Sequence, residues 1–223
     1  ALATKQDLEA ATLADFDVVR VLGRGAFGKV SLVQHKTSHE KYALKTLNKK
    51  MLVAVKQSKG AITEREVLKQ KGHPCIVRLY WAFQDDESLH MVLDYLPGGC
   101  LDTLLERNGA LSASSARFYV ACAAAALEFL HARDLVHRDV KPSNLVVDAA
   151  GYARLVDFGF ARRLAPGERS VSLLGTPEYL APEIFLNEGH AAPADLYALG
   201  ATLHELLTDT HPFSGDDPQQ VYA

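Results

Sequence analysis

Two short stretches determine how this chain is interpreted: HRDVKPSN at His137–Asn144 and, thirteen residues after Asn144, DFG at Asp157–Gly159. Together they contain a carboxylate that can orient a hydroxyl, a lysine, and two side chains with oxygen ligands. An isolated aspartate is more often a turn former or a helix cap, so the argument depends on the order and the spacing. This set of groups is the one needed to move a phosphoryl group from Mg-ATP to an alcohol.

Each polar residue of these stretches has a distinct expected role. Asp139 accepts or orients the substrate hydroxyl, and Lys141 is close enough in the chain to neutralise charge on the transferring group. Asn144 and Asp157 offer hard oxygen ligands, which suit Mg²⁺ carried by the nucleotide. Because the reaction needs little covalent help, we expect these residues mainly to position groups and to offset developing charge.

A glycine-rich segment, GRGAFGKV at Gly23–Val30, has the spacing G-x-G-x-x-G-x-V. Dinucleotide-binding folds use nearly the same glycine spacing, but their glycines open a helix. Here β-branched residues follow the glycines, which predicts a strand–turn–strand hairpin. Such a turn can bring backbone N–H groups close to phosphate oxygens, although an ordinary glycine-rich hairpin has the same pattern.

Lys45 ends a short apolar strand fifteen residues after Val30. A lysine at a strand end is usually only solvated, so its interpretation depends on a partner. Glu64 and Glu66, on the helix that follows, are the two candidates for an ion pair that holds Lys45 toward the phosphates. We prefer Glu64, because Val67 and Leu68 then follow at the three- and four-residue spacing that packs inward.

The apolar pattern changes at Pro97-Gly98-Gly99. The strands expected before this break lie at 15–21, 30–33, 42–45, 76–79 and 89–93, with a helix over 61–70. The helices expected after it lie at 101–107, 112–133 and 195–209. These patterns indicate three parts: a polar lead-in at 1–14, a small ATP-binding lobe at 15–96 and a large lobe at 97–223.

Composition excludes several classes of protein. The net charge of −3 gives no indication of nucleic acid or an anionic membrane as a partner. Three cysteines (Cys75, Cys100 and Cys122) are odd in number and far apart in the chain, which argues against a disulfide framework. The most apolar run, 118–130, is too short to span a membrane, and no secretory signal is visible. We therefore expect a cytoplasmic protein.

Taken together, these motifs resemble those of eukaryotic protein kinases, from Phe16 to about Tyr222. The resemblance also rests on GTPEY at Gly175–Tyr179, APE at Ala181–Glu183, and Asp195 with Ala198-Leu199-Gly200. Lys141 and Thr176 are typical of the serine/threonine branch. Within it, LVDFGFAR at Leu155–Arg162 and LNEGH at Leu186–His190 resemble the AGC group and its cGMP-dependent members.

The resemblance implies an α+β, bilobal fold, with a small antiparallel sheet lobe carrying one main helix and a larger, mainly helical lobe. It implies ATP and Mg²⁺ as cofactors, and Lys45, Glu64, Asp139 and Lys141 as catalytic residues. The residues implied for ATP binding are Leu22, Gly23, Arg24, Gly25, Ala26, Phe27, Gly28, Lys29, Val30, Ala43, Lys45, Leu93, Asp94, Leu96 and Val146. Leu68, Leu79, His137 and Phe158 are implied to form an apolar spine.

By the same resemblance, Ser172 is a candidate site for an activating phosphate from an upstream kinase, and Thr176 and Glu205 position the protein substrate. Two positions depart from the basophilic members of the group. Cys100 and Ser143 stand where glutamates usually contact a substrate arginine. Losing two of three carboxylates predicts a weaker preference for arginine upstream of the target residue.

The resemblance implies a kinase that transfers the γ-phosphoryl group of ATP to Ser/Thr hydroxyls of proteins. A pseudokinase or scaffold is the alternative, but its usual signature is loss of Lys45, Asp139 or Asp157, and all three are present. Small-molecule phosphotransferases share some of this chemistry, whereas the segment 175–183 favours protein substrates. Because the family's domain continues with further helices, we expect an incomplete large lobe, low stability and the further alternative of a binding fragment.

Overall fold

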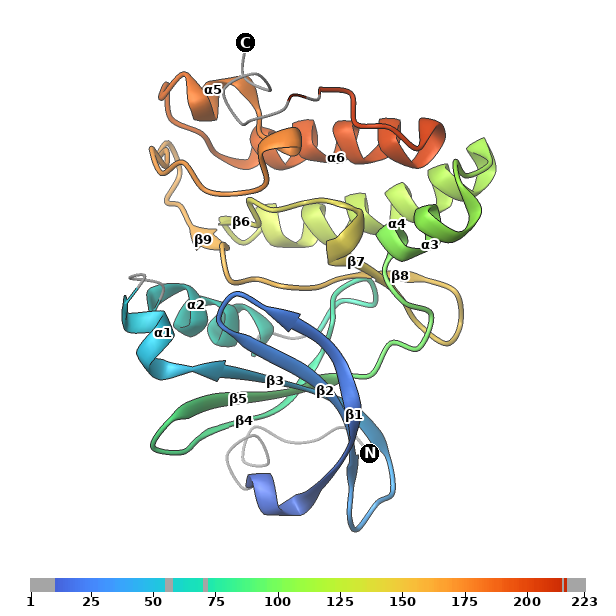
Figure 1. Cartoon of the computed structure of the whole chain (residues 1–223). Helices are drawn as coiled ribbons and strands as arrows, with labels where there is room; N and C mark the ends of the chain where they lie inside the picture. The colour runs from blue at the N-terminus through green and yellow to red at the C-terminus, as the bar shows by residue number, and fades with distance from the viewer. Residues whose placement is uncertain (1–10, 55–57, 70–71, 214, 216–223) are drawn as a thin grey trace. The chain divides into compact units, whose positions relative to one another are not determined.

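The computed structural model describes residues 11–54, 58–69, 72–213 and 215 (Figure 1). The chain divides into two compact units, residues 1–72 with 77–96 and residues 73–76 with 97–223. The sequence pattern placed 73–76 in the first lobe, whereas the contacts group this segment with the second unit. The Leu155 N–H donates to the Cys75 carbonyl at 2.8 Å, and Ile76 forms a β-bridge with Leu155, so this segment packs on the second unit.

An antiparallel five-stranded sheet forms the first unit, in the order β1-β2-β3-β5-β4. Its elements are η2 (Leu13–Asp15), β1 (Phe16–Gly25), β2 (Gly28–His35), β3 (Lys41–Asn48), α1 (Lys49–Ala54), α2 (Ser58–Leu68), β4 (Leu79–Gln84) and β5 (Ser88–Asp94). Most of the expected lead-in lies outside the described residues. The strand expected at 76–79 instead begins at Leu79, because Ile76 is held by the second unit.

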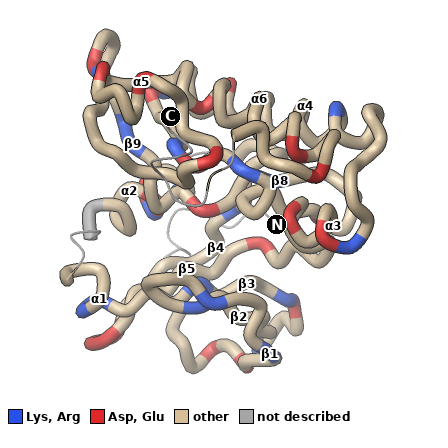
Figure 2. The backbone as a smooth tube through the Cα atoms, turned by 45° about the horizontal axis from the view of Figure 1, so that its top comes forward, with Lys and Arg blue, Asp and Glu red and all other residues tan. Residues whose placement is uncertain are grey.

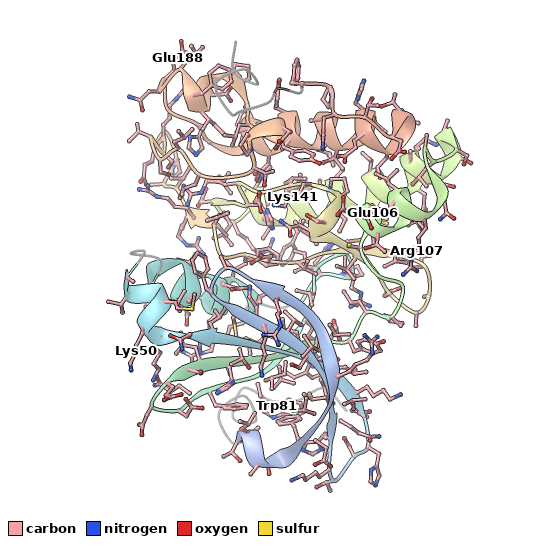
Figure 3. All side chains as sticks on the ribbon, viewed as in Figure 1. Lys50, Trp81, Glu106, Arg107, Lys141 and Glu188 are labelled. Carbon is pink, nitrogen blue, oxygen red and sulfur yellow. The ribbon has the colours of Figure 1, made fainter. Side chains whose placement is uncertain are left out.

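Aromatic packing stabilises the first unit. Phe16, Val33, Tyr42 and Val92 are buried in one core cluster, against which Trp81 packs (Figure 3). The rings of Phe16 and Trp81 meet edge to face with centroids 5.6 Å apart, and those of Tyr42 and Trp81 do so at 5.2 Å. Edge-to-face pairs add to the free energy gained by burying apolar area, so β1, β3 and β4 are tied together on one sheet face.

The second unit is mainly helical. Its elements are α3 (Leu101–Asn108), α4 (Ala113–His131), β6 (Leu135–Val136), η3 (Pro142–Asn144), β7 (Leu145–Val147), β8 (Ala153–Leu155), β9 (Arg162–Arg163), η4 (Pro177–Tyr179), α5 (Pro182–Phe185) and α6 (Ala192–Thr208). Strands β6 and β9 form one two-stranded sheet, and β7 and β8 form another. A sheet unit and a helical unit make an α+β fold, so the expected fold class is confirmed.

Helix α4 is the core of the second unit. Ser112 caps it by accepting a hydrogen bond from the Ser115 N–H at 3.2 Å, as a serine at this position predicts. By length and composition alone this helix could cross a membrane, a test that the core helix of a globular protein also passes. Ala116, Ala126 and Leu127 are fully buried, and α4 packs against α6 and β8 (Figure 1). It is therefore a core helix of the unit.

Candidate active site

The glycine-rich segment forms a hairpin at the end of the first unit's sheet. Gly25 of β1 pairs with Gly28 of β2, and the Asn48 N–H donates to the Phe27 carbonyl at 2.9 Å. A Cβ atom built on Gly28 would lie 1.9 Å from the Thr46 carbonyl oxygen, so only glycine fits where β2 meets β3. The segment is a strand–turn–strand element, as predicted, and does not open a helix.

Lys45 forms a buried ion pair with Glu64. The Lys45 Nζ lies 2.7 and 2.9 Å from the two carboxylate oxygens of Glu64. The side chains are only 15% and 2% exposed, respectively, which strengthens the electrostatic attraction between them. Glu66 points to solvent, where it approaches Arg65 and Lys69, so Glu64 is the partner that the helical spacing indicated.

The apolar residues proposed to surround adenine belong to both units. In the first unit, Val30 pairs with Lys45, and Ala43 pairs with Leu93, so these side chains lie on neighbouring strands. Leu22 of β1 is exposed. Val146 belongs to β7 of the second unit, where it bridges Cys100.

Asp94 ends β5 and is tied to the neighbouring strand. Its N–H donates to the Arg78 carbonyl at 3.0 Å, and its carboxylate accepts hydrogen bonds from the Arg78 N–H and the Tyr80 hydroxyl, both at 2.9 Å. This carboxylate therefore has a structural role in the first unit. If Asp94 binds adenine, it would do so through its backbone and not through its carboxylate.

Asp139 is the centre of a polar network in the second unit. One carboxylate oxygen accepts from the Thr176 hydroxyl at 2.8 Å, and the other accepts from the Asn144 amide at 2.9 Å and lies 3.0 Å from the Lys141 Nζ. The Lys141 Nζ also donates to the Thr176 hydroxyl at 2.6 Å. Asp139 is 7% exposed. The network thus brings together a carboxylate and a cation from one loop and a hydroxyl from a segment about 35 residues later, Thr176 (Lys141 is labelled in Figure 3).

The side chains expected to hold Mg²⁺ have suitable donor atoms. The Asn144 Nδ2 donates to both the carbonyl and the carboxylate of Asp139, which turns the amide oxygen to the opposite side. Asp157 has a left-handed backbone (φ 59°), a conformation that aspartate tolerates better than most residues. Phe158, which follows it, is fully buried with its ring 5.0 Å from the His137 ring. One amide and one carboxylate oxygen fit the hard ligand set of this metal.

The segment after β9 contacts the loop that carries Asp139, through Arg138 of that loop. Its Nη1 donates to the Ser172 hydroxyl at 2.7 Å, and its Nε donates to the Phe160 carbonyl at 2.7 Å. Gly175 has φ 125°, and a Cβ atom there would lie 2.9 Å from the Arg138 carbonyl oxygen. Glycine is therefore required at the point where this segment crosses the loop.

Of the two residues expected to position a substrate, Thr176 belongs to the Asp139 network, whereas Glu205 has other partners. Glu205 of α6 is buried, accepts a hydrogen bond from the Tyr179 hydroxyl, and lies 3.7 Å from the His211 Nδ1. Cys100 precedes α3, with its Sγ 3.2 Å from the Thr103 hydroxyl, and Ser143 is exposed in η3. Neither of these two positions supplies a carboxylate.

A family model described as a protein kinase domain matches residues 16–223. The chain belongs to the protein kinase family. It is 41% identical over 220 residues to the cGMP-dependent protein kinase, isozyme 1, of Drosophila melanogaster, covering 98% of this chain and 29% of that protein. It is 40% identical over 211 residues to the human cAMP-dependent protein kinase catalytic subunit PRKX, covering 95% of this chain and 58% of that protein.

A third relative is the cAMP-dependent protein kinase catalytic subunit of Dictyostelium discoideum, with 43% identity over 210 residues, 94% of this chain and 32% of that protein. The kinase chain therefore spans less than two thirds of the length of each of these relatives. Similarity to both cGMP- and cAMP-dependent enzymes confirms the expected resemblance to the AGC group of kinases.

Sequence reasoning missed the residue that holds the kinase catalytic loop in place. Asp195 of α6 is 1% exposed; its carboxylate accepts from the backbone N–H groups of His137 at 2.8 Å and Arg138 at 2.7 Å, and from the His131 Nε2 at 2.7 Å. Asp195 was noted only as a member of a family motif. A charge among the apolar residues 194–201 was a signal that could have marked it, because a buried carboxylate needs hydrogen-bond donors.

The Lys45–Glu64 pair leads to a stability prediction for the kinase domain. We expect Glu64→Gln to lower the free energy of unfolding by about 1–3 kcal/mol, because a neutral amide replaces a buried carboxylate beside the Lys45 ammonium. Chemical denaturation at neutral pH measures the effect. Glu66→Gln is the matched control, two residues away and exposed, and we expect it to change stability by less than about 0.5 kcal/mol. Equal losses for the two variants would contradict this account.

Proposed function

We propose that this chain is the catalytic part of an ATP-dependent serine/threonine protein kinase. The observation that carries the proposal is the Asp139 network, in which Lys141, Asn144 and Thr176 converge on one buried carboxylate. The names of the relatives support the same activity, since they are cAMP- and cGMP-dependent protein kinases. We place the protein in the cytoplasm, where its cysteines would stay reduced.

Asp139 would orient the substrate hydroxyl and accept its proton as the phosphoryl group is transferred. In this structure its Oδ1 accepts a hydrogen bond from the Thr176 hydroxyl, which is the same chemical group as the hydroxyl of a substrate serine or threonine. Lys141, 3.0 Å from the same carboxylate, would offset negative charge on the transferring group. These residues would act by position and charge, and no covalent intermediate on the protein is needed.

In the first unit, Lys45 would contact the α- and β-phosphates. The buried Glu64 carboxylate accepts two short hydrogen bonds from its ammonium group, which fixes where the positive charge lies. The hairpin at Gly23–Val30 would add backbone N–H groups. Asn144 and Asp157 would hold Mg²⁺, which when bound neutralises phosphate charge.

A pseudokinase is the weaker alternative. Lys45 and Asp139 are present and are held by partners suited to their roles. Asp157 stands in the left-handed conformation directly before the buried Phe158. We also propose Ser172 as a site phosphorylated by an upstream kinase, because its hydroxyl accepts a hydrogen bond from the Arg138 guanidinium.

Transfer of labelled γ-phosphate from Mg-ATP to a serine/threonine peptide array tests the activity. We expect transfer, and we expect Asp139→Asn to reduce it by about 10²–10⁴-fold, the usual contribution of a positioned acid–base group. Asp86→Asn, at an exposed turn of the first unit, is the control and should keep full activity. Asp157→Asn serves as the blank. Absence of transfer by the full-length protein would favour the pseudokinase.

Substrate preference gives a second prediction. We expect only weak selection for arginine upstream of the target residue, because Cys100 and Ser143 replace carboxylates and Glu205 is bonded to Tyr179. The double variant Cys100→Glu, Ser143→Glu should raise kcat/KM for arginine-containing peptides by about tenfold or more, the value of a charge-assisted hydrogen bond. Peptides with alanine in place of that arginine are the control. Strong arginine selection by the natural sequence would contradict the prediction.

A further inference from the structure

Ser170 and Ser172 lie in a small basic cluster in the second unit. The Arg138 Nη1 donates to the Ser170 hydroxyl at 3.1 Å and to the Ser172 hydroxyl at 2.7 Å, and the Arg162 Nη1 donates to Ser170 at 3.4 Å. The two serine hydroxyls are 2.8 Å apart. Arg162 belongs to β9, where the tube of Figure 2 is blue. Two arginines meeting at two hydroxyls are a suitable environment for an anion.

His190 lies directly opposite Ser170 of this cluster, and paired residues of an antiparallel bridge project their side chains to the same face. Its backbone pairs with that of Ser170 through two hydrogen bonds, of 2.8 and 2.9 Å, in an isolated antiparallel bridge. The residue is 2% exposed. Within the part of the chain that the structure describes, its Nε2 atom is buried and has no hydrogen-bond partner. A buried polar atom without a partner is costly, so this position calls for a functional explanation.

Charges of both signs lie around the cluster and His190, since the Arg162 Nη2 also donates to the Glu168 carboxylate at 2.9 Å. Burial lowers the pKa of His190 most, followed by the positive charges of Arg138 and Arg162, while Glu183 and Asp195 act in the opposite direction. Arg169 donates to the carbonyl of the preceding Gly189 at 3.1 Å. Burial and the two guanidinium charges therefore favour the neutral imidazole in the unmodified protein.

We propose that His190 is the third member of a phosphate-binding site that forms around Ser172, and that it takes up a proton when Ser172 is phosphorylated. This proposal rests on the phosphorylation of Ser172 proposed above. In that reaction the Ser172 Oγ forms a bond to the γ-phosphorus of ATP, the bond to the ADP oxygen breaks, and the hydroxyl proton leaves. The imidazole then gains a proton from solvent.

The physical reason is the change in local charge. A phosphoserine adds about −1.5 to −2 charge at neutral pH, which offsets the two arginines that disfavour a positive imidazole. Ser170 is fully buried whereas Ser172 is half-buried, so Ser172 is the serine with room for the group. Arg138 and Arg162 would bind the phosphate oxygens, and the protonated imidazole would add positive charge from the side of α5 and α6. Uptake of the proton thus couples phosphorylation to pH.

Nuclear magnetic resonance of the full chain tests the proposal directly. The imidazole carbons are ¹³C-labelled, phosphoserine is incorporated at 172 during translation, and His190→Gln assigns the His190 signal. We expect the titration midpoint of His190 to move to higher pH in the phosphorylated protein, while that of His39, exposed in the first unit, stays unchanged. The same midpoint with and without the phosphate would overturn the proposal. Carrying out both titrations in Asp157→Asn separates this result from kinase activity.

Removal of the phosphate gives a second readout. We expect His190→Gln to speed dephosphorylation of phosphoserine 172 by an added phosphatase about tenfold near pH 6.5, and to do so less at pH 8, where a smaller fraction of any imidazole is protonated. His204→Gln, exposed on α6, is the control and should leave the rate unchanged. An equal rate for natural protein and His190→Gln at both pH values would contradict the assignment. If His190→Gln folds poorly, sequential resonance assignment identifies the His190 signal instead, and the midpoint measurement on the unsubstituted histidine decides the matter.

Discussion

The buried carboxylate of Asp195 is the constraint on which the second unit depends. It is 1% exposed and accepts hydrogen bonds from the His137 and Arg138 N–H groups and from the His131 Nε2. A buried carboxylate is stable only when such donors surround it. The donors come from α4 and from the loop after β6, and the acceptor comes from α6. One side chain therefore ties two helices to the loop that carries Asp139.

The effect of Asp195 extends through Arg138. This arginine has φ 69°, which is unfavourable for any residue that carries a Cβ atom and persists only where its surroundings hold it. Asp195 fixes its N–H, and the Phe160 carbonyl and Ser172 hydroxyl fix its side chain. A carboxylate on α6 is thus linked to the segment that carries Ser172 and Thr176. Through Thr176 the link returns to Asp139.

Sequence alone predicted most of the elements and part of the site. The Lys45–Glu64 contact could be predicted because helical spacing places Glu64 on the same face as Val67 and Leu68, and all three are buried. The hairpin at Gly23–Val30 could be predicted because β-branched residues follow the glycines. In both cases the interaction follows from local periodicity.

Other features depended on contacts between distant parts of the chain. The composition around Ile76 predicts a strand of the first unit. Its β-bridge to Leu155 places it in the second unit instead. The environment of His190 could not be anticipated, because Ser170 lies twenty residues earlier and Arg138 more than fifty. Burial of Asp195 likewise requires α4, α6 and the catalytic loop to be assembled together.

Amide hydrogen exchange in Asp195→Asn tests the central role of this carboxylate most directly. Asparagine has one acceptor oxygen where aspartate has two, so it cannot accept from all three donors. We predict that exchange at the His137 and Arg138 amides becomes at least about tenfold faster, equivalent to losing about 1.4 kcal/mol of protection. Asp209→Asn, just after the same helix and exposed, should leave these amides unchanged. Unchanged exchange at both amides in Asp195→Asn would contradict the account.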